Sequence, residues 1–125
     1  MSSRNVLRLL QAAREINAKT ADYSVKAEDF DSILTNRGAA GAVVFTLPKA
    51  ANAKGGIVEF YCLVDEDMTV AGSSGELVVD NNASATSIKL GQTGEQIGAG
   101  FRAVCDGTSW IVVLLSGEAV TVTIA

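Results

Sequence analysis

The sequence contains no histidine, one proline, one tryptophan and two cysteines among its 125 residues. Histidine is the most common general base and the most common nitrogen ligand of metal sites, so its absence removes the usual centre of both kinds of chemistry. Serine and threonine are plentiful, but without a neighbouring base they are weak nucleophiles. The sequence therefore predicts a protein that is not an enzyme, with no catalytic residue, no metal site and no cofactor.

Two clusters bear a superficial likeness to ligand sites. The acidic run Asp65–Asp67 lacks the alternating ligands and the distal glutamate of a calcium loop. The glycines Gly94, Gly98 and Gly100 are not followed by the lysine and hydroxyl residue of a phosphate loop. We interpret the first cluster as a solvated turn and the second as turn glycines.

Charged residues are also scarce. They make up 19% of the chain, whereas apolar residues make up 48%. A small soluble domain usually has about 25% charged residues. Two explanations are open: an oligomer that hides surface in subunit contacts, or a core larger than the chain length suggests. We favour the oligomer.

Long apolar runs are missing as well. A helix that crosses a bilayer needs about 18 continuous apolar residues, and no stretch approaches this length. Near the N-terminus, Arg8 and Arg14 interrupt what would be the apolar region of a secretory signal. We expect a protein without a membrane partner that is made and folds in a reducing cytoplasm.

The charge that is present is unevenly distributed. Residues 1–20 carry four basic side chains and one acidic one, a net charge of +3. The whole chain has a net charge of −4, so the other 105 residues together have a net charge of −7. A nucleic-acid binder normally has a basic face on its main fold, and this body is acidic. We expect no direct binding to nucleic acid, and instead a basic arm that docks on an acidic protein surface.

The spacing of apolar residues predicts an amphipathic helix over residues 4–18. Its apolar stripe consists of Val6, Leu7, Leu9, Leu10, Ala13 and Ile16, and its polar side includes Arg4, Arg8, Gln11 and Glu15. Such a helix is marginal alone in water, so the stripe must rest on something. It either packs on its own domain or docks on a neighbouring subunit or another protein. Together with Arg14, the residues expected to make such contacts are Arg4, Val6, Leu7, Arg8, Leu10 and Ile16.

After residue 20 the apolar period becomes alternating. Short strands are expected at 23–25, 32–36, 42–47, 57–64, 68–70, 76–80, 87–90, 101–105, 110–115 and 120–124, with Gly, Asn and Asp residues at the breaks. This pattern predicts a mainly β fold, a small sandwich or barrel-like domain of short antiparallel strands with an N-terminal amphipathic helix or arm. We expect a docking arm at 1–20 and a β-sandwich body at 21–125.

The body is organised around a hairpin at residues 101–113. Asp106 and Gly107 favour a tight reversal, because both tolerate left-handed backbone geometry. The second arm begins at Trp110 and is expected to run through the core. The large apolar side chains expected in the core are Phe45, Phe60, Phe101 and Trp110.

Apolar residues occupy both faces of the strand expected at 57–64. Val58, Phe60, Cys62 and Val64 share one face, and Ile57, Tyr61 and Leu63 share the other face with Glu59. We therefore expect both faces to be largely covered. Cys62 and Cys105 each lie among apolar neighbours and are interpreted as buried free thiols, with a disulfide between them as the alternative.

Three segments in this order resemble a known class of protein: residues 23–36, Gly41–Pro48 and Cys105–Trp110. Their layout is similar to small β-domains of tailed-bacteriophage virions, especially capsid decoration (cement) proteins. The resemblance spans roughly residues 22–115 and consists of structural motifs.

The resemblance implies a non-enzymatic subunit, often trimeric, that sits on the outer surface of the icosahedral head. Its partner would be the major capsid protein, and it would stabilise the shell against internal DNA pressure. The alternative is a head- or tail-fibre module that binds a host-surface receptor or glycan. An intracellular assembly factor is a further class, and it would be absent from finished virions.

Overall fold

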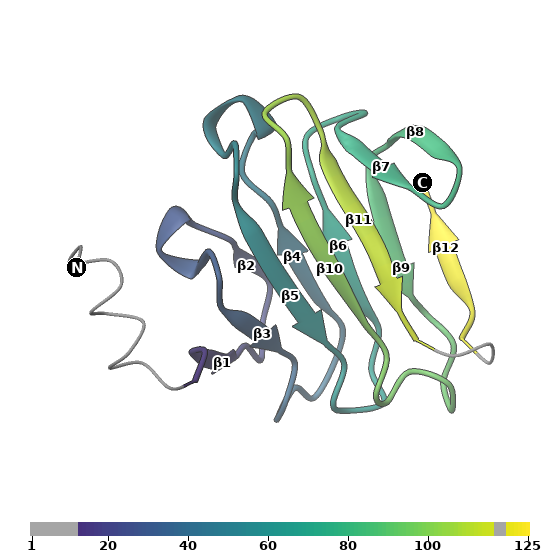
Figure 1. Cartoon of the computed structure of the whole chain (residues 1–125). Helices are drawn as coiled ribbons and strands as arrows, with labels where there is room; N and C mark the ends of the chain where they lie inside the picture. Colours follow the sequence, from purple (N-terminus) through teal and green to yellow (C-terminus); the bar gives the residue numbers. More distant parts are fainter. Residues whose placement is uncertain (1–12, 117–119) are drawn as a thin grey trace.

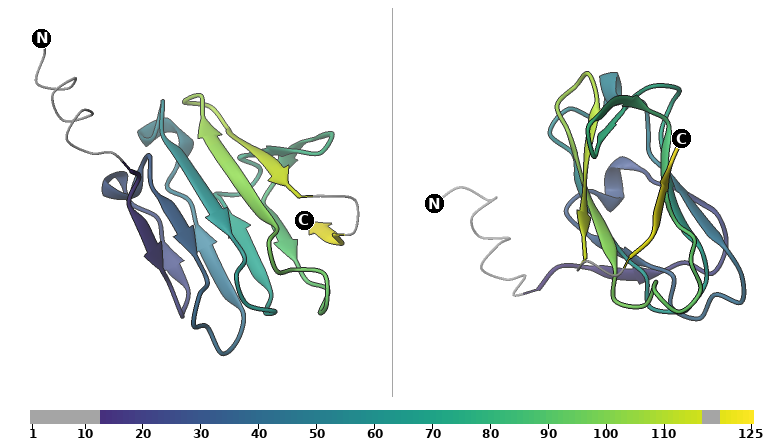
Figure 2. Two further views of the ribbon diagram at one scale, coloured as in Figure 1. Left: turned by 60° about the horizontal axis from the view of Figure 1, so that its bottom comes forward. Right: turned by 90° about the vertical axis from the view of Figure 1, so that its right-hand side faces the viewer.

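The computed structural model describes residues 13–116 and 120–125, which fold into two β-sheets packed face to face (Figures 1 and 2). This confirms the prediction of a mainly β, sandwich-like fold. In sheet order, the seven-stranded sheet consists of β1 (Ile16–Ala18), β3 (Ile33–Thr35), β5 (Ile57–Tyr61), β10 (Gly100–Cys105), β11 (Trp110–Leu115), β7 (Leu77–Val79) and β8 (Asn82–Ala85). The five-stranded sheet consists of β12 (Val122–Ile124), β9 (Ser87–Leu90), β6 (Met68–Ala71), β4 (Val43–Thr46) and β2 (Tyr23–Ser24).

The first six strands alternate between the two sheets. As a result β1, β3 and β5 run parallel in one sheet, and β2, β4 and β6 run parallel in the other. Antiparallel pairing enters with β7 and β8 and continues with β9, β10, β11 and β12, while β11 runs parallel to β7. The sheets are therefore mixed, and the expectation of antiparallel strands holds for most pairs in the second half of the chain and for none among the first six strands. Parallel strands need a crossover connection, which brings the chain back to start the next strand in the same direction. The alternation of apolar and polar residues does not reveal such a connection.

The core lies between the sheets. The four side chains expected there, Phe45, Phe60, Phe101 and Trp110, are all fully buried. The Phe45 and Phe60 rings are 5.1 Å apart between centroids, and the Phe30 ring meets the Trp110 indole edge-on at 6.1 Å. The Trp110 Nε1–H donates to the carbonyl oxygen of Pro48 at 2.8 Å, which satisfies the one polar atom of the indole.

The expected hairpin joins β10 to β11, in register from Cys105 opposite Trp110 to Gly100 opposite Leu115. In its turn, the Asp106 carboxylate accepts the N–H groups of Thr108 and Ser109 at 2.8 Å each. These hydrogen bonds to Ser109 and Thr108 lower the pKa of the Asp106 carboxyl. Gly107 has a φ of 94°, in the left-handed region that the sequence led us to expect.

The helix predicted over residues 4–18 is wrong at its C-terminal end. Residues 16–18 form the edge strand β1, held to β3 by hydrogen bonds from the Ile33 N–H to the Glu15 carbonyl and from the Lys19 N–H to the Thr35 carbonyl. Pairing with a neighbouring strand overrides a local helical pattern here. The boundary expected at residue 20, between the arm and the body, therefore falls after β1, which belongs to the seven-stranded sheet. Residues 4–12 lie outside the described residues.

Residues 82–85, expected to be a loop, form β8, which pairs with β7 at the far edge of the seven-stranded sheet. The reversal before β8 places Asp80 and Asn81 at φ 44° and 67°. Asp and Asn tolerate this left-handed geometry better than most residues, so a tight turn replaces the expected loop.

Cys62 and Cys105 are both buried free thiols, as interpreted from the sequence, and the disulfide alternative is wrong. Burial raises the pKa of the Cys62 thiol. Helical structure in the described ranges is limited to the single turns Ala27–Asp29 and Ala50–Asn52, so no described helix is long enough to cross a membrane.

Tyr23 on β2 is tied to the turn that follows it. Its hydroxyl donates to Asp29 Oδ2 at 2.8 Å, and the same oxygen accepts the Lys26 N–H at 2.8 Å. The Lys19 ammonium lies 3.9 Å from the centroid of the Tyr23 ring. The hydrogen bond to Asp29, together with partial burial and the nearby carboxylates, raises the pKa of Tyr23 to about 12.

We expect this contact to support the fold only while Tyr23 keeps its proton. Because the pKa is raised on folding, the contribution is fully present below about pH 10 and is lost as the pH rises through about 12. Ultraviolet titration of a Tyr61→Phe variant, in which Tyr23 is the one remaining tyrosine, should give a phenolate midpoint near 12 while circular dichroism still reports folded protein. Adding Asp29→Asn to this variant should move the midpoint toward 10. A midpoint of about 10 in the Tyr61→Phe variant alone would show that Tyr23 does not donate to Asp29.

Candidate functional site

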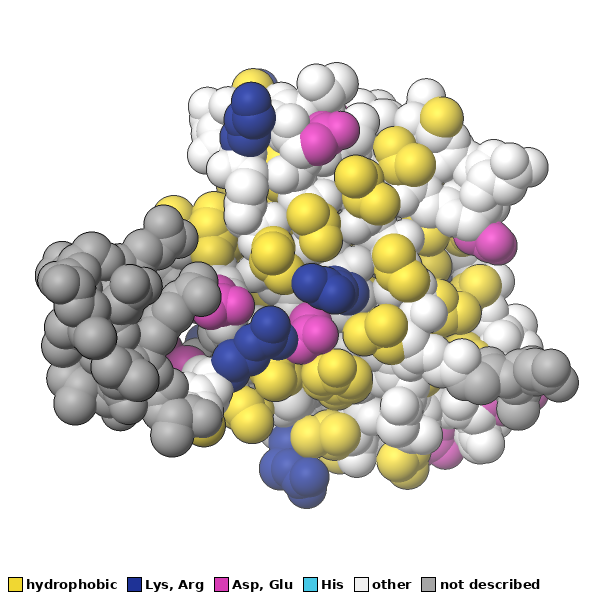
Figure 3. All heavy atoms as spheres, viewed as in Figure 1, with side chains coloured by type: hydrophobic (Ala, Val, Ile, Leu, Met, Phe, Trp, Pro, Cys, Tyr) yellow, Lys and Arg dark blue, Asp and Glu magenta, His cyan; other side chains and the backbone are white. Residues whose placement is uncertain are grey.

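The two outer faces of the sandwich differ in chemistry. The outward side chains of the five-stranded sheet are mostly polar: Ser24, Thr46, Thr69, Ser87, Lys89 and Thr123. Those of the seven-stranded sheet are mostly aliphatic: Ile16, Ile33, Ile57, Val78, Val104, Ile111, Val113 and Leu115. We call the second set the apolar face. Figure 3 views this side of the molecule, with hydrophobic side chains spread over the sheet and charged ones gathered near its middle.

Strand register arranges the apolar face in rows that run across the sheet. One row is Ile57, Val104, Ile111 and Val78. The middle row is Ile16, Ile33, Glu59, Arg102 and Val113, and the third row is Tyr61, Gly100 and Leu115. Ile16, Ile111 and Val113 are 64%, 39% and 51% exposed, so no described element covers these parts of the face. Exposed aliphatic side chains at both sides of one sheet face make this face a candidate interaction surface.

The charged side chains of the middle row are unequally paired. The Arg14 guanidinium donates from Nη1 to Glu59 Oε2, and its Nε lies 3.6 Å from Asp31 Oδ1. Arg102 stands beside Glu59 in the strand register, yet its guanidinium makes no ion pair or hydrogen bond with a described residue. The apolar face therefore has one paired and one unpaired cation at its centre.

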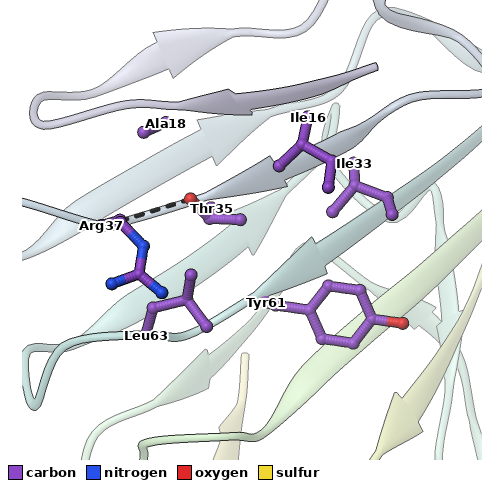
Figure 4. Close-up of a pocket in the computed structure, with 7 residues that line it drawn as sticks. All are labelled: Ile16, Ala18, Ile33, Thr35, Arg37, Tyr61 and Leu63. Atoms are coloured by element: carbon purple, nitrogen blue, oxygen red, sulfur yellow. Dashed lines mark hydrogen bonds between the residues drawn. The ribbon is translucent and has the colours of Figure 1, made fainter. Parts of the chain in front are cut away.

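One end of the apolar face is hollowed, as Figure 4 shows. The hollow has a volume of about 480 Å³ and is lined by Ile16, Ala18, Ile33, Thr35, Arg37, Tyr61 and Leu63. In this view the Ile16 and Ile33 side chains lie together, while Tyr61 extends away from them. A Cβ on Gly100 would lie 2.7 Å from Tyr61 Cδ1 and 2.2 Å from the Phe60 carbonyl oxygen, so only glycine fits beside this ring.

Two of the contact residues expected from the sequence lie at this site. Arg14 is held by Glu59 and Asp31, and Ile16 lines the hollow. The others, Arg4, Val6, Leu7, Arg8 and Leu10, lie outside the described residues.

Sequence reasoning missed most of the apolar face, although two signals were present. The run Trp110–Leu115 is apolar at every position, so both of its faces had to be apolar. The apolar positions Ile57, Tyr61 and Leu63 were expected to be covered, and in the structure each is half-buried rather than buried.

The acidic run serves as a structural anchor in the fold. Both carboxylate oxygens of Asp65 accept the Gly94 N–H at 3.0 Å, and Asp67 Oδ1 accepts from Gln96 Nε2 at 3.3 Å. These bonds hold the glycine-rich loop against the end of the sandwich. In the part of the chain that the structure describes, no group of three or more acidic or cysteine side chains is placed to hold a metal ion.

Comparisons with known protein families, with curated proteins and with solved structures give no match to this chain.

Proposed function

We propose that this protein is a non-enzymatic structural subunit that works by burying broad surfaces against other proteins. The observation that carries this proposal is the contrast between the apolar face and the polar outer face of the other sheet. Water stabilises a polar sheet face, whereas an aliphatic face of this extent favours contact with a protein. A receptor or catalyst would instead need convergent polar groups in a concave site, whereas the hollow beside Tyr61 is lined mostly by aliphatic side chains.

The setting we propose is the outer surface of a tailed-bacteriophage head, with the chain as a capsid decoration protein. Support comes from the resemblance of residues 23–36, Gly41–Pro48 and Cys105–Trp110 to decoration domains. These segments include β2, β3 and β4 and the turn of the central hairpin. Their roles are to build the sandwich, so they support the class of protein and assign no binding residue.

In this proposal the N-terminal segment fastens the body to the major capsid protein. Arg4 and Arg8 face acidic capsid surface, and Val6, Leu7 and Leu10 enter an apolar groove. Each buried aliphatic side chain contributes about 1.5–3 kcal/mol, less the cost of ordering the segment. Repetition over the capsid lattice adds avidity. Arg14 contributes less, because it is already bound to Glu59 and Asp31 within the chain.

A fibre module that binds a receptor or glycan is the second candidate. Such a site favours exposed aromatic or polar clusters on loop tips. The glycine-rich loop instead exposes Ile97, at 66%, next to Asp65 and Glu95. This loop chemistry favours decoration over receptor binding.

Counting copies in purified virions tests the proposal. Quantitative mass spectrometry should find hundreds of copies of this chain per head, in a fixed ratio to the major capsid protein. A handful of copies would indicate a fibre, and absence would indicate an assembly factor; either result would overturn decoration.

A truncation tests the proposed contact segment. The deletion should stop at residue 12, because a longer one would remove Arg14 and β1 from the sheet. Chain lacking residues 1–12 should fold, by circular dichroism, and should no longer sediment with undecorated shells. Thr46→Ala, an exposed change on the polar outer face of the body, is the matched control and should bind like the parent.

A further inference from the structure

We infer that two copies of this chain pair through the apolar face, about a two-fold axis that runs nearly parallel to the strands between β5 and β10. This inference does not depend on the capsid setting, because it concerns the free protein. It starts from the one outer face of the sandwich that is aliphatic and has exposed isoleucine and valine side chains along its strands.

Charge complementarity identifies the occupant as a second copy. Glu59 and Arg102 are register neighbours on β5 and β10, so the proposed axis passes between them. Rotation about it places Arg102 of each copy opposite Glu59 of the other. Glu59 Oε2 is bound to Arg14, while Oε1 has no hydrogen-bond partner among the described residues. The Arg102 guanidinium of one copy therefore lies opposite Glu59 Oε1 of the second copy, and the reverse contact forms by symmetry.

The apolar residues follow the same symmetry. The axis exchanges β5 with β10 and β3 with β11, so Ile57 faces the second copy's Val104, and Ile33 faces its Val113. Aliphatic side chains thus meet aliphatic side chains on both sides of the central charges. Two twisted sheets that pack face to face cross at about 30°, which this axis permits.

The size of the face suits a modest but specific interface. The axis divides the six strands from β1 to β7 into three on each side. Six strands about 4.8 Å apart and three rows of side chains about 6.7 Å apart span roughly 29 by 20 Å. Two such footprints bury roughly 1,150 Å², which is near the lower limit for a specific protein interface. A self-complementary face closes as a dimer, since a cyclic trimer needs two different patches. The expected state is therefore a dimer rather than the trimer that the resemblance implies.

Sedimentation equilibrium of the full chain over a range of concentrations tests the pairing. The parent should be a dimer that dissociates on dilution. Ile111→Lys and Val113→Lys should raise the dissociation constant at least tenfold, because each places a charge within the apolar rows. Thr46→Lys and Thr123→Lys, on the polar outer face, are the matched controls and should leave it unchanged. A monomeric or trimeric parent, or equal effects on the two faces, would overturn the inference.

A charge exchange tests the position of the axis. Arg102→Glu alone places two acidic groups opposite each other at each contact, and Glu59→Arg alone places two basic groups there, so each variant should dimerise at least tenfold more weakly than the parent. An equimolar mixture should form heterodimers, because each of the four facing groups then meets its opposite. A mixture that stays monomeric would refute this register. If Glu59→Arg does not fold, the comparison of the lysine variants on the two faces still decides the proposal.

Discussion

Replacing Trp110 by alanine is expected to lower the free energy of unfolding by about 3–5 kcal/mol, the usual range for deleting a large buried aromatic side chain. The indole is fully buried, meets the Phe30 ring at 6.1 Å between centroids and donates its Nε1–H to the Pro48 carbonyl at 2.8 Å. Alanine leaves a cavity at the start of β11 and removes the hydrogen bond that ties this strand to the end of β4. The loss approaches the whole stability of a typical small domain.

Chemical denaturation followed by far-ultraviolet circular dichroism measures this change, because the variant has no tryptophan left for fluorescence. Trp110→Phe should lose less than the alanine variant, since a ring still fills most of the space while the Pro48 contact is gone. Thr123→Ala, at an exposed position of β12, should change stability by no more than about 0.5 kcal/mol. A loss below about 1.5 kcal/mol for Trp110→Ala would show that the indole is not a core element. All variants should be compared at one protein concentration, since pairing through the apolar face would add to stability.

Asn36→Ala is expected to cost about 2–4 kcal/mol, from several lost hydrogen bonds and unsatisfied buried groups. The Asn36 side chain is fully buried between the strand ends of β3 and β5. Its Oδ1 accepts the N–H groups of Leu63 and Val64 at 2.7 and 3.3 Å, and its Nδ2 donates to Cys62 Sγ at 3.4 Å. Alanine leaves both amides without this acceptor at the point where the chain departs from the sheet.

Hydrogen exchange distinguishes this specific role from a general loss of stability. The Leu63 and Val64 amides should exchange faster in Asn36→Ala than expected from the global change, while amides at the centre of β10 should follow global unfolding alone. Arg37→Ala, at the exposed neighbouring position, should affect neither. Uniform acceleration of exchange across the sheet would contradict the local role of Asn36.

Local patterns were sufficient for most of the strands and for the large side chains of the core. Val43 and Phe45 alternate with the less buried Val44 and Thr46, and they lie on the buried side of β4 as the period of two requires. Asp106 and Gly107 form the expected reversal, because their backbone preferences are local properties. These features depend on neighbours in the sequence, so one sequence can reveal them.

Local patterns could not predict contacts between segments that are distant in the sequence. Asn36 was interpreted as a strand residue. Nothing near it in the sequence reveals that its side-chain oxygen accepts the N–H groups of Leu63 and Val64. Ile16 fitted the apolar stripe of a helix and also a strand, and the pairing of β1 with β3 decided for the strand. The parallel order of the first six strands follows from connections that cross between sheets, which residue alternation does not record.

The sequence by itself determined that no histidine is present for acid–base or metal chemistry and that few charged residues are available. It also determined the mainly β fold and the buried position of Trp110, because alternation and turn preference act over a few residues. Only the tertiary structure decided which surface is available. Strand register brought Ile33, Arg102 and Val113 into one row from three separate segments, and such a row exists only once the sheet has formed.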